Sequence, residues 1–498
     1  MQKNTMQKNT MPKNTIEKNT ISNGTSKNQE NTGCPYSKKC GGCMYTSIPY
    51  EEQLKQKQNM ICTKLSEVTK KSNIKPSAIV GAEHPLYYRN KVHSAFDRDA
   101  HGHIIRGIYQ EDSHKVVNVS GCMIENKTAD RVIEEIKKLL PSFKLKVYDE
   151  DTHYGFLRHV MVRVASYKND TKLLIVLVTS IVNFPSKNNF IKVLREKFPE
   201  IETIVQNIND KRTSMILGER NIVLYGKGFI LDDSLGICFR ISPSAFFQIN
   251  SEQTYKLYSI ASDFAGLTGK ETVLDAYCGT GTIGMFLASK ANQVIGVELN
   301  RDAVKDAIYN SKLNKIDNIF FVNDDATEYM TRLAGKKALN DEEVKDLNID
   351  VLIMDPPRSG STPEFIKSVN NLAIRRVVYV SCNPESLARD LKEFSGYGYI
   401  IKKITPVDMF PQTGHVETVC LLSKLREAKH HVRVKMDMDE MDLTSTESKA
   451  TYEEIKKYVA EHNGGMKVSN LYIAQVKRKC GLELAEAIME ALKAFRMI

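Results

Sequence analysis

The sequence contains no tryptophan and no apolar run long enough to cross a lipid bilayer. Its longest apolar stretch, residues 173–178 with Ile181 and Val182 beyond it, is far shorter than the roughly 20 residues of a membrane-spanning helix. The N-terminus also lacks the apolar core of a secretory signal peptide. We therefore expect a cytoplasmic protein without membrane association, whose ten cysteines bind metal or catalyse a reaction rather than form disulfides.

The composition is otherwise that of an ordinary globular protein of several domains, with 498 residues of which 42% are hydrophobic and 26% are charged. The formal net charge of +10 is compatible with a polyanionic partner such as RNA. Since tryptophan is absent, base stacking would rely on tyrosine, phenylalanine, histidine or arginine. Residues 1–33 repeat a polar five-residue unit that cannot bury a core, so we expect a disordered tail.

Three cysteines near the start of the chain follow a C-x5-C-x2-C spacing: Cys34, Cys40 and Cys43. The candidates for a fourth ligand are Cys62, which lies in an apparently helical run from Tyr50 to Lys71, and Cys122, which follows a strand and a glycine. We prefer Cys122 because that position suits a ligand on a turn. Four thiolates fit either structural zinc or an iron–sulfur cluster. The three-plus-one arrangement favours the cluster, because zinc sites usually pair two C-x2-C motifs.

The region that follows alternates basic, aromatic and polar residues over 84–125, a pattern that suits single-stranded nucleic acid and equally a solvated sheet face. Two apolar runs between Arg158 and Ser180 flank Lys168 to Asp170 and predict a hairpin. Short strands with glycine turns continue to Ile241. We therefore expect an α+β central region.

Beyond Ser242 the pattern changes to alternating strands and helices, which predicts a doubly wound, mostly parallel sheet. The expected strands are 272–277, 293–299, 318–323, 350–354, 377–380, 399–405 and 418–422. Residues 427–498 read as an acidic linker and three short helices with a basic tip. That module could contact RNA or serve as a docking element.

Two patterns on the expected sheet indicate a nucleotide-like cofactor. Residues 274–284 form a strand, a G-x-G-x-x-G turn and a helix start, where small residues let the backbone approach a ligand. Glu298 ends the next strand and could bind both ribose hydroxyls of an adenosine group. NAD and S-adenosylmethionine satisfy this logic equally well.

A further motif resolves this choice, because Asp355-Pro-Pro-Arg358 follows a buried strand and a strand ending in Asp-Pro-Pro is typical of methyltransferases. Another strand, 377–380, is followed by Cys382, and Pro384 begins the next helix. A cysteine at this edge of the sheet lies where such folds bind ligands, and we expect the helix N-terminus to favour its thiolate.

These motifs together resemble the RNA uracil-5-methyltransferases, in particular the iron–sulfur enzymes that act on 23S ribosomal RNA. The likeness runs from Cys34 to about Leu425. It rests on the cysteine spacing and on further segments: Ser-Ala-Phe-Phe-Gln-Ile-Asn at 244–250, Asp-Ala-Tyr-Cys-Gly-Thr-Gly at 275–281, Asp-Pro-Pro-Arg at 355–358, Ser-Cys-Asn-Pro at 381–384 and Gly-His-Val-Glu-Thr at 414–418.

The resemblance implies that Cys382 is the nucleophile, that Glu417 is the general base, and that S-adenosylmethionine contacts four residues: Gln248, Tyr277, Glu298 and Asp355. It implies a multi-domain α/β protein whose Rossmann-like methyltransferase domain, 241–426, follows an α+β iron–sulfur and RNA-binding region at 34–240. The tail at 1–33 stands where the family often carries a β-barrel, and the helices of 427–498 lie outside the shared core. Both departures bear on RNA docking.

Two other functions remain open on these motifs. The first is uracil-5 methylation of transfer RNA, which the motifs do not separate from the ribosomal reaction. The second is a non-catalytic RNA-binding or ribosome-assembly factor, against which the intact Cys382 and Glu417 argue. DNA cytosine methylation is disfavoured because Ser381 precedes the cysteine where a proline is usual. Adenine N6 methylation is disfavoured because Arg358 replaces an aromatic residue. No obligate protein partner is evident.

Overall fold

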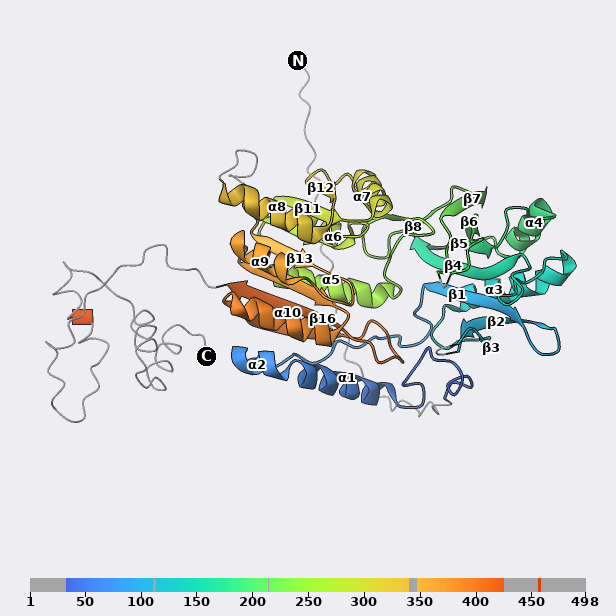
Figure 1. Ribbon diagram of the computed structural model, residues 1–498, viewed down its shortest axis with the longest axis horizontal. Helices are drawn as coiled ribbons and strands as arrows, with labels where there is room; N and C mark the ends of the chain where they lie inside the picture. The colour runs from blue at the N-terminus through green and yellow to red at the C-terminus, as the bar shows by residue number, and fades with distance from the viewer. Residues whose placement is uncertain (1–32, 111–112, 214, 340–346, 425–455, 458–498) are drawn as a thin grey trace, which may run out of the picture. The chain divides into compact units, whose positions relative to one another are not determined.

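The computed structural model describes residues 33–110, 113–213, 215–339, 347–424 and 456–457 (Figure 1). The repeat tail up to residue 32 lies outside the described residues, and so do the predicted C-terminal helices apart from Lys456 and Lys457. Residues 1–425 and 426–498 form separate compact units. The described part of the first unit holds two seven-stranded sheets and a two-stranded ribbon.

The first sheet has the strand order β3-β2-β1-β4-β5-β6-β7. Its strands are β1 (Lys91–Arg98), β2 (Ile104–Tyr109), β3 (Val116–Asn118), β4 (Leu157–Tyr167), β5 (Asp170–Thr179), β6 (Ile201–Ile208) and β7 (Arg220–Tyr225). Helices α3 (Lys127–Ser142) and α4 (Lys187–Lys197) pack on one face. The predicted hairpin joins β4 to β5, with Lys168 and Asn169 both at positive φ.

The second sheet is the predicted doubly wound sheet, with the order β12-β11-β10-β13-β14-β16-β15. Its strands are β10 (Thr272–Ala276), β11 (Gln293–Glu298), β12 (Ile319–Asn323), β13 (Val351–Met354), β14 (Arg376–Ser381), β15 (Tyr399–Val407) and β16 (Glu417–Lys424). The first five are parallel, and β16 runs antiparallel to both of its neighbours. All seven expected strands are confirmed, with ends shifted by up to two residues.

Helices cover both faces of this sheet. Successive strand residues point to opposite sides, so neighbouring residues of one strand contact different helices. Val273 and Val378 face α5 (Ser251–Ala265), α6 (Thr282–Ala288) and α7 (Arg301–Leu313). Leu274 and Val377 face α8 (Ala326–Ala338), α9 (Pro363–Asn371) and α10 (Pro384–Gly396), which lie side by side (Figure 1). The central strands β13 and β14 are therefore buried on both sides, as their apolar runs require.

Two helices from the beginning of the described chain pack beside α10, which belongs to the methyltransferase sheet much later in the sequence (Figure 1). The single helical run expected from residue 50 to residue 71 is divided into α1 (Tyr50–Lys64) and α2 (Ser66–Ser72) around Leu65. The ribbon of β8 (Ile230–Asp232) and β9 (Phe239–Ile241) precedes α5. Among the described helices, none combines the length and apolar character needed to cross a bilayer.

Candidate active site

A cavity of about 1140 Å³ opens at the carboxyl ends of the parallel strands of the second sheet. Six residues singled out from the sequence line it: Gln248, Tyr277, Glu298, Asp355, Cys382 and Glu417. They come from four parallel strands, from the segment before α5 and from the start of β16. The structure thus gathers side chains that lie up to 169 positions apart in the sequence, as the topology of such sheets predicts.

The glycine turn forms one wall of this cavity. Tyr277 has φ of 63°, an unfavourable value for a non-glycine residue that is found mostly where function constrains the backbone. A Cβ on Gly281 would lie 2.7 Å from a ring carbon of Phe321, so only glycine fits there. The Glu298 carboxylate accepts hydrogen bonds from the backbone N–H groups of Gly279 at 3.0 Å and Asn300 at 2.7 Å. This carboxylate is therefore held at the wall.

Cys382 lies between β14 and α10, at the edge of the cavity. Asn383 caps α10 by accepting from the N–H of Glu385 at 3.0 Å, and its side-chain amide donates to the carbonyl of Arg358 at 3.0 Å. Burial, followed by the nearby carboxyl groups of Glu417 and Asp355, raises the pKa of the Cys382 thiol to about 11. In the ligand-free protein, desolvation of the thiolate therefore outweighs any stabilisation from the N-terminus of α10.

Two carboxyl groups meet beside this thiol. Asp355 follows β13 and is partly buried, and Glu417 begins β16 and is buried. Burial raises the pKa of Glu417, and the neighbouring Asp355 raises it further, whereas Arg358 lowers it. Desolvation likewise raises the pKa of Asp355. Two neighbouring carboxyl groups that interact in this way titrate as a pair and retain a proton more readily than either would alone.

A guanidinium provides positive charge in the cavity. Arg358 Nη2 lies 2.9 Å from His415 Nδ1. Burial lowers the pKa of His415, and the charge of Arg358 lowers it further, which favours the neutral imidazole as the acceptor of this hydrogen bond. Arg358 also opposes the rise in the pKa values of Cys382 and Glu417.

The raised pKa of Cys382 leads to a pH prediction for the free protein. Only the thiolate reacts with iodoacetamide, and its fraction rises about tenfold per pH unit below the thiol pKa. Alkylation of Cys382, followed by peptide mass spectrometry, should therefore be slow near pH 7 and should accelerate steadily beyond pH 9. A rate that levels off below pH 8 would show that the protein stabilises the thiolate without a ligand.

Sequence reasoning missed several residues that line the cavity. Phe246 and Leu299 expose 69% and 67% of their surfaces although both are apolar. Exposed apolar side chains on a cavity are suited to packing against a planar ring of a ligand. Leu299 directly follows Glu298, and Phe246 lies two positions before Gln248. This closeness in sequence to residues already singled out was the available signal. Asp325 caps α8 beyond the end of β12, and Arg89 reaches the cavity from the segment just before β1. Only the fold reveals that Arg89 reaches this cavity.

The four cysteines of the predicted cluster also come together. The loop of Cys34–Cys43 packs against the loop that carries Cys122, and Tyr36 donates a hydrogen bond from its hydroxyl to the carbonyl of Ser120 at 2.9 Å. Cys43 interacts electrostatically with Cys34, Cys40 and Cys122. All four are free thiols, and burial raises the pKa of Cys43 to about 11. Cys62, in contrast, is exposed on α1.

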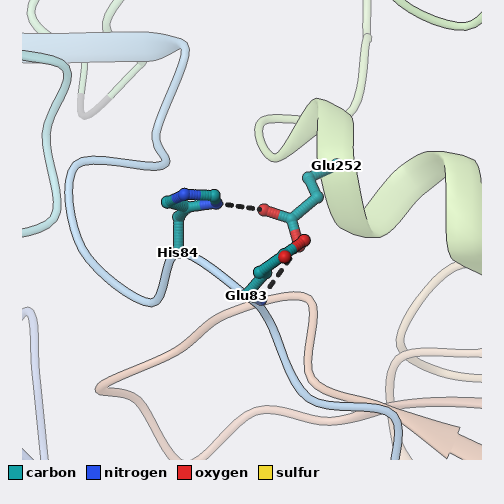
Figure 2. A group of neighbouring side chains, drawn as sticks. All are labelled: Glu83, His84 and Glu252. Atoms are coloured by element: carbon teal, nitrogen blue, oxygen red, sulfur yellow. Dashed lines mark hydrogen bonds and ion pairs between the residues drawn. The ribbon is translucent and has the colours of Figure 1, made fainter. Parts of the chain in front are cut away.

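A second group of potential metal ligands lies elsewhere on the surface: Glu83, His84 and Glu252 (Figure 2). Glu252 Oε2 lies 3.2 Å from His84 Nδ1, and Glu252 Oε1 accepts from the N–H of Glu83 at 2.9 Å. Lys256 also donates to Glu252 at 2.7 Å and so already neutralises the carboxylate. These contacts attach the segment before β1 to the first turn of α5.

Comparison with known proteins identifies the family. The profile described as tRNA (Uracil-5-)-methyltransferase matches residues 191–425. An uncharacterized RNA methyltransferase of Halalkalibacterium halodurans is 39% identical over 80% of this chain and 84% of its own length. One of Clostridium acetobutylicum is 40% identical over 80% and 85%. The Pyrococcus abyssi tRNA (uracil-54, C5)-methyltransferase in complex with S-adenosyl-L-homocysteine has a TM-score of 0.62 at 29% identity, with 77% of this chain and 86% of that chain covered.

The fold and the cavity are those of a Rossmann-like methyltransferase. The chain belongs to the RNA uracil-5-methyltransferases, a family of S-adenosylmethionine-dependent enzymes that modify RNA.

Proposed function

We propose that this enzyme methylates C5 of uracil in 23S ribosomal RNA through covalent addition of Cys382 to C6. The observation that carries this proposal is the position of Cys382 and Glu417 on one cavity, beside the glycine turn and the Asp355 loop. A nucleophile, a general base and the proposed cofactor-binding residues are thereby all within reach of a single uracil ring. The uracil must leave its stack in the RNA to enter the cavity, at a cost of a few kcal/mol.

The residues account for the chemistry in order. Uracil C5 is a weak nucleophile, and addition of the Cys382 thiolate to C6 places the electron pair of the C5–C6 double bond on the C5–C4–O4 enolate. S-adenosylmethionine, when bound, supplies the electrophilic methyl group that C5 takes. Glu417 then removes the C5 proton, the C5–C6 double bond re-forms, and the thiolate leaves. Arg358 provides the positive charge nearest to these groups.

We further propose that Gln248, Tyr277, Glu298 and Asp355 hold the cofactor. The fixed carboxylate of Glu298 supports a bond to the ribose hydroxyls. Glu298→Ala should weaken cofactor binding by about 1.5–3 kcal/mol, the range for hydrogen bonds to charged groups. Calorimetry with S-adenosylhomocysteine measures this directly, and RNA affinity should change little. Wild-type cofactor affinity in the variant would place the adenosine elsewhere.

Cys34, Cys40, Cys43 and Cys122 are proposed as the ligands of an iron–sulfur cluster of the 4Fe-4S type. Tetrahedral zinc, with Zn–S bonds of about 2.3 Å, would bring the sulfurs about 3.8 Å from one another. Among the described residues such a group is formed by Glu83, His84 and Glu252, whereas no three of the four thiols have sulfurs that all lie within 4.8 Å of one another. Wider spacing supports a cluster, in which each sulfur binds a different iron.

The choice of ribosomal RNA over transfer RNA rests on that cysteine set. The similar Pyrococcus abyssi enzyme, in contrast, is named for uracil 54 of transfer RNA. We propose that basic and aromatic residues within 84–125 bind single-stranded RNA. We also propose that the enzyme acts in the cytoplasm. Mapping 5-methyluridine in both RNA classes from cells lacking this protein distinguishes the substrates. Loss from 23S RNA alone supports the proposal, and loss from transfer RNA alone would replace it.

A further inference from the structure

The segment Asp408 to Val416 delivers two side chains to the active site. It joins β15 to β16, its residues Phe410 and His415 line the cavity, and Glu417 follows it directly. We call it the base segment. Although it forms no strand or helix, Asp408, Met409, Gln412 and Thr413 are almost completely buried. A buried irregular segment needs partners for its polar groups from outside.

Helix α1 supplies an ion pair to the start of the base segment. Lys57 Nζ lies 2.5 Å from Asp408 Oδ1, and both side chains are fully buried. The same ammonium donates to the carbonyl of Phe410 at 3.1 Å. The hydroxyl of Tyr50, also on α1, donates to Asp408 Oδ2 at 2.8 Å. One face of α1 thus fixes both the first carboxylate and the following turn.

The same helix holds the middle of the base segment through a reciprocal amide pair. Gln53 accepts from the N–H of Gln412 at 3.0 Å and donates to Gln412 Oε1 at 3.0 Å. Gln412 has φ of 70°, so its backbone is held in an unfavourable conformation that these bonds compensate. The N–H groups of Met44 and Tyr45, next to Cys43, both donate to the carbonyl of Gln412 at 3.0 Å.

These contacts are directional. Replacing a buried ion pair with neutral groups of similar shape is often neutral or stabilising. What the polar network adds is a single arrangement of the base segment relative to the sheet. None of the three α1 residues lines the cavity, so they act only through this segment.

We propose that helix α1 positions the general base, with Lys57 and Gln53 as positioning residues that hold the base segment so that Glu417 faces the substrate. This inference rests on the proposed function. The nucleophile has supports of its own outside the base segment, because Cys382 lies between β14 and α10, and Asn383, which follows it, bonds to the carbonyl of Arg358. Loosening the base segment should therefore slow removal of the C5 proton while addition and methyl transfer continue.

The test uses the full-length enzyme, RNA carrying tritium at uracil C5, and S-adenosylmethionine with a labelled methyl group. Wild-type enzyme should release one tritium for each methyl transferred. In Lys57→Met and Gln53→Leu, methyl transfer in a single turnover should exceed tritium release. The methylated protein–RNA adduct should accumulate at least several-fold above wild type on denaturing gels.

Two variants separate positioning from folding. Lys57→Met combined with Asp408→Asn leaves no unpaired buried charge, so its melting temperature should return toward that of wild type while the adduct still accumulates. Ile133→Ala, in the core between α3 and the first sheet, should lower the melting temperature without producing adduct. Coupled release of tritium in both α1 variants, with wild-type enzyme active, would overturn this inference alone. Inactive wild-type enzyme would overturn the proposed function as well.

Discussion

Cys382→Ala is expected to leave RNA both unmethylated and unattached to the protein. Without the thiolate, C6 receives no electron pair and C5 remains too weak a nucleophile to take the methyl group. Activity should fall to the level of the reaction without enzyme. The measurement is incorporation of labelled methyl into RNA, together with denaturing electrophoresis. Cofactor affinity should stay close to that of wild type, which serves as the check that the cavity is intact.

Glu417→Gln is expected to stop the same reaction one step later. The amide keeps the shape of the side chain but cannot accept the C5 proton, so turnover should fall by about 10²–10⁴-fold, the usual contribution of a general base. Addition and methyl transfer should still occur, and the thiolate cannot leave. A methylated covalent adduct should therefore survive denaturing electrophoresis.

The combination of the two substitutions is the control for this trap. The double variant should form no adduct, because the bond depends on Cys382. A Cys382→Ala enzyme with appreciable turnover would contradict the covalent mechanism altogether. If Glu417→Gln turned over at the wild-type rate, another group would be the base, and the positioning role of α1 would fall with it.

Cys122→Ala is expected to remove iron and sulfide from the protein. Anaerobically purified wild type should be brown, with broad visible absorption, and should contain both elements. Loss of one of four ligands opens the cluster to solvent and should leave the variant nearly iron-free. Elemental analysis and visible spectroscopy measure this without reference to enzymatic activity.

Cys62→Ala is the matched control, since Cys62 was the other candidate ligand but is exposed on α1. That variant should retain the iron and colour of wild type. Stoichiometric zinc without iron in the wild type would contradict the cluster. Because Met44 and Tyr45 bond to Gln412 just beyond Cys43, loss of the cluster should also weaken the base segment.

Local patterns in the sequence predicted the second sheet well. Its central strands are largely apolar, as in Val351–Met354 and residues 377–380, and parallel topology then gathers their carboxyl ends at one edge. This is why residues as distant as Tyr277 and Cys382 could be assigned to one site. The break at Leu65 was missed because no glycine or proline marks it.

Environment-dependent properties could not be predicted from pattern alone. The thiol of Cys382 lies beyond a strand and before a helix, as expected, yet its pKa is raised by burial and by the Asp355 and Glu417 carboxyl groups. Those groups meet only in three dimensions. The same is true of Lys57 and Asp408, which pair across 351 positions of sequence although nothing local marks either residue.

The most direct test of the account is the identity of the methylated nucleoside. Purified enzyme is incubated with methyl-labelled S-adenosylmethionine and unmodified 23S ribosomal RNA, and the RNA is digested to nucleosides and separated. The account predicts that the label elutes with 5-methyluridine and is absent when Cys382→Ala replaces the wild type. Label in any other nucleoside, or equal label with the variant, would contradict it.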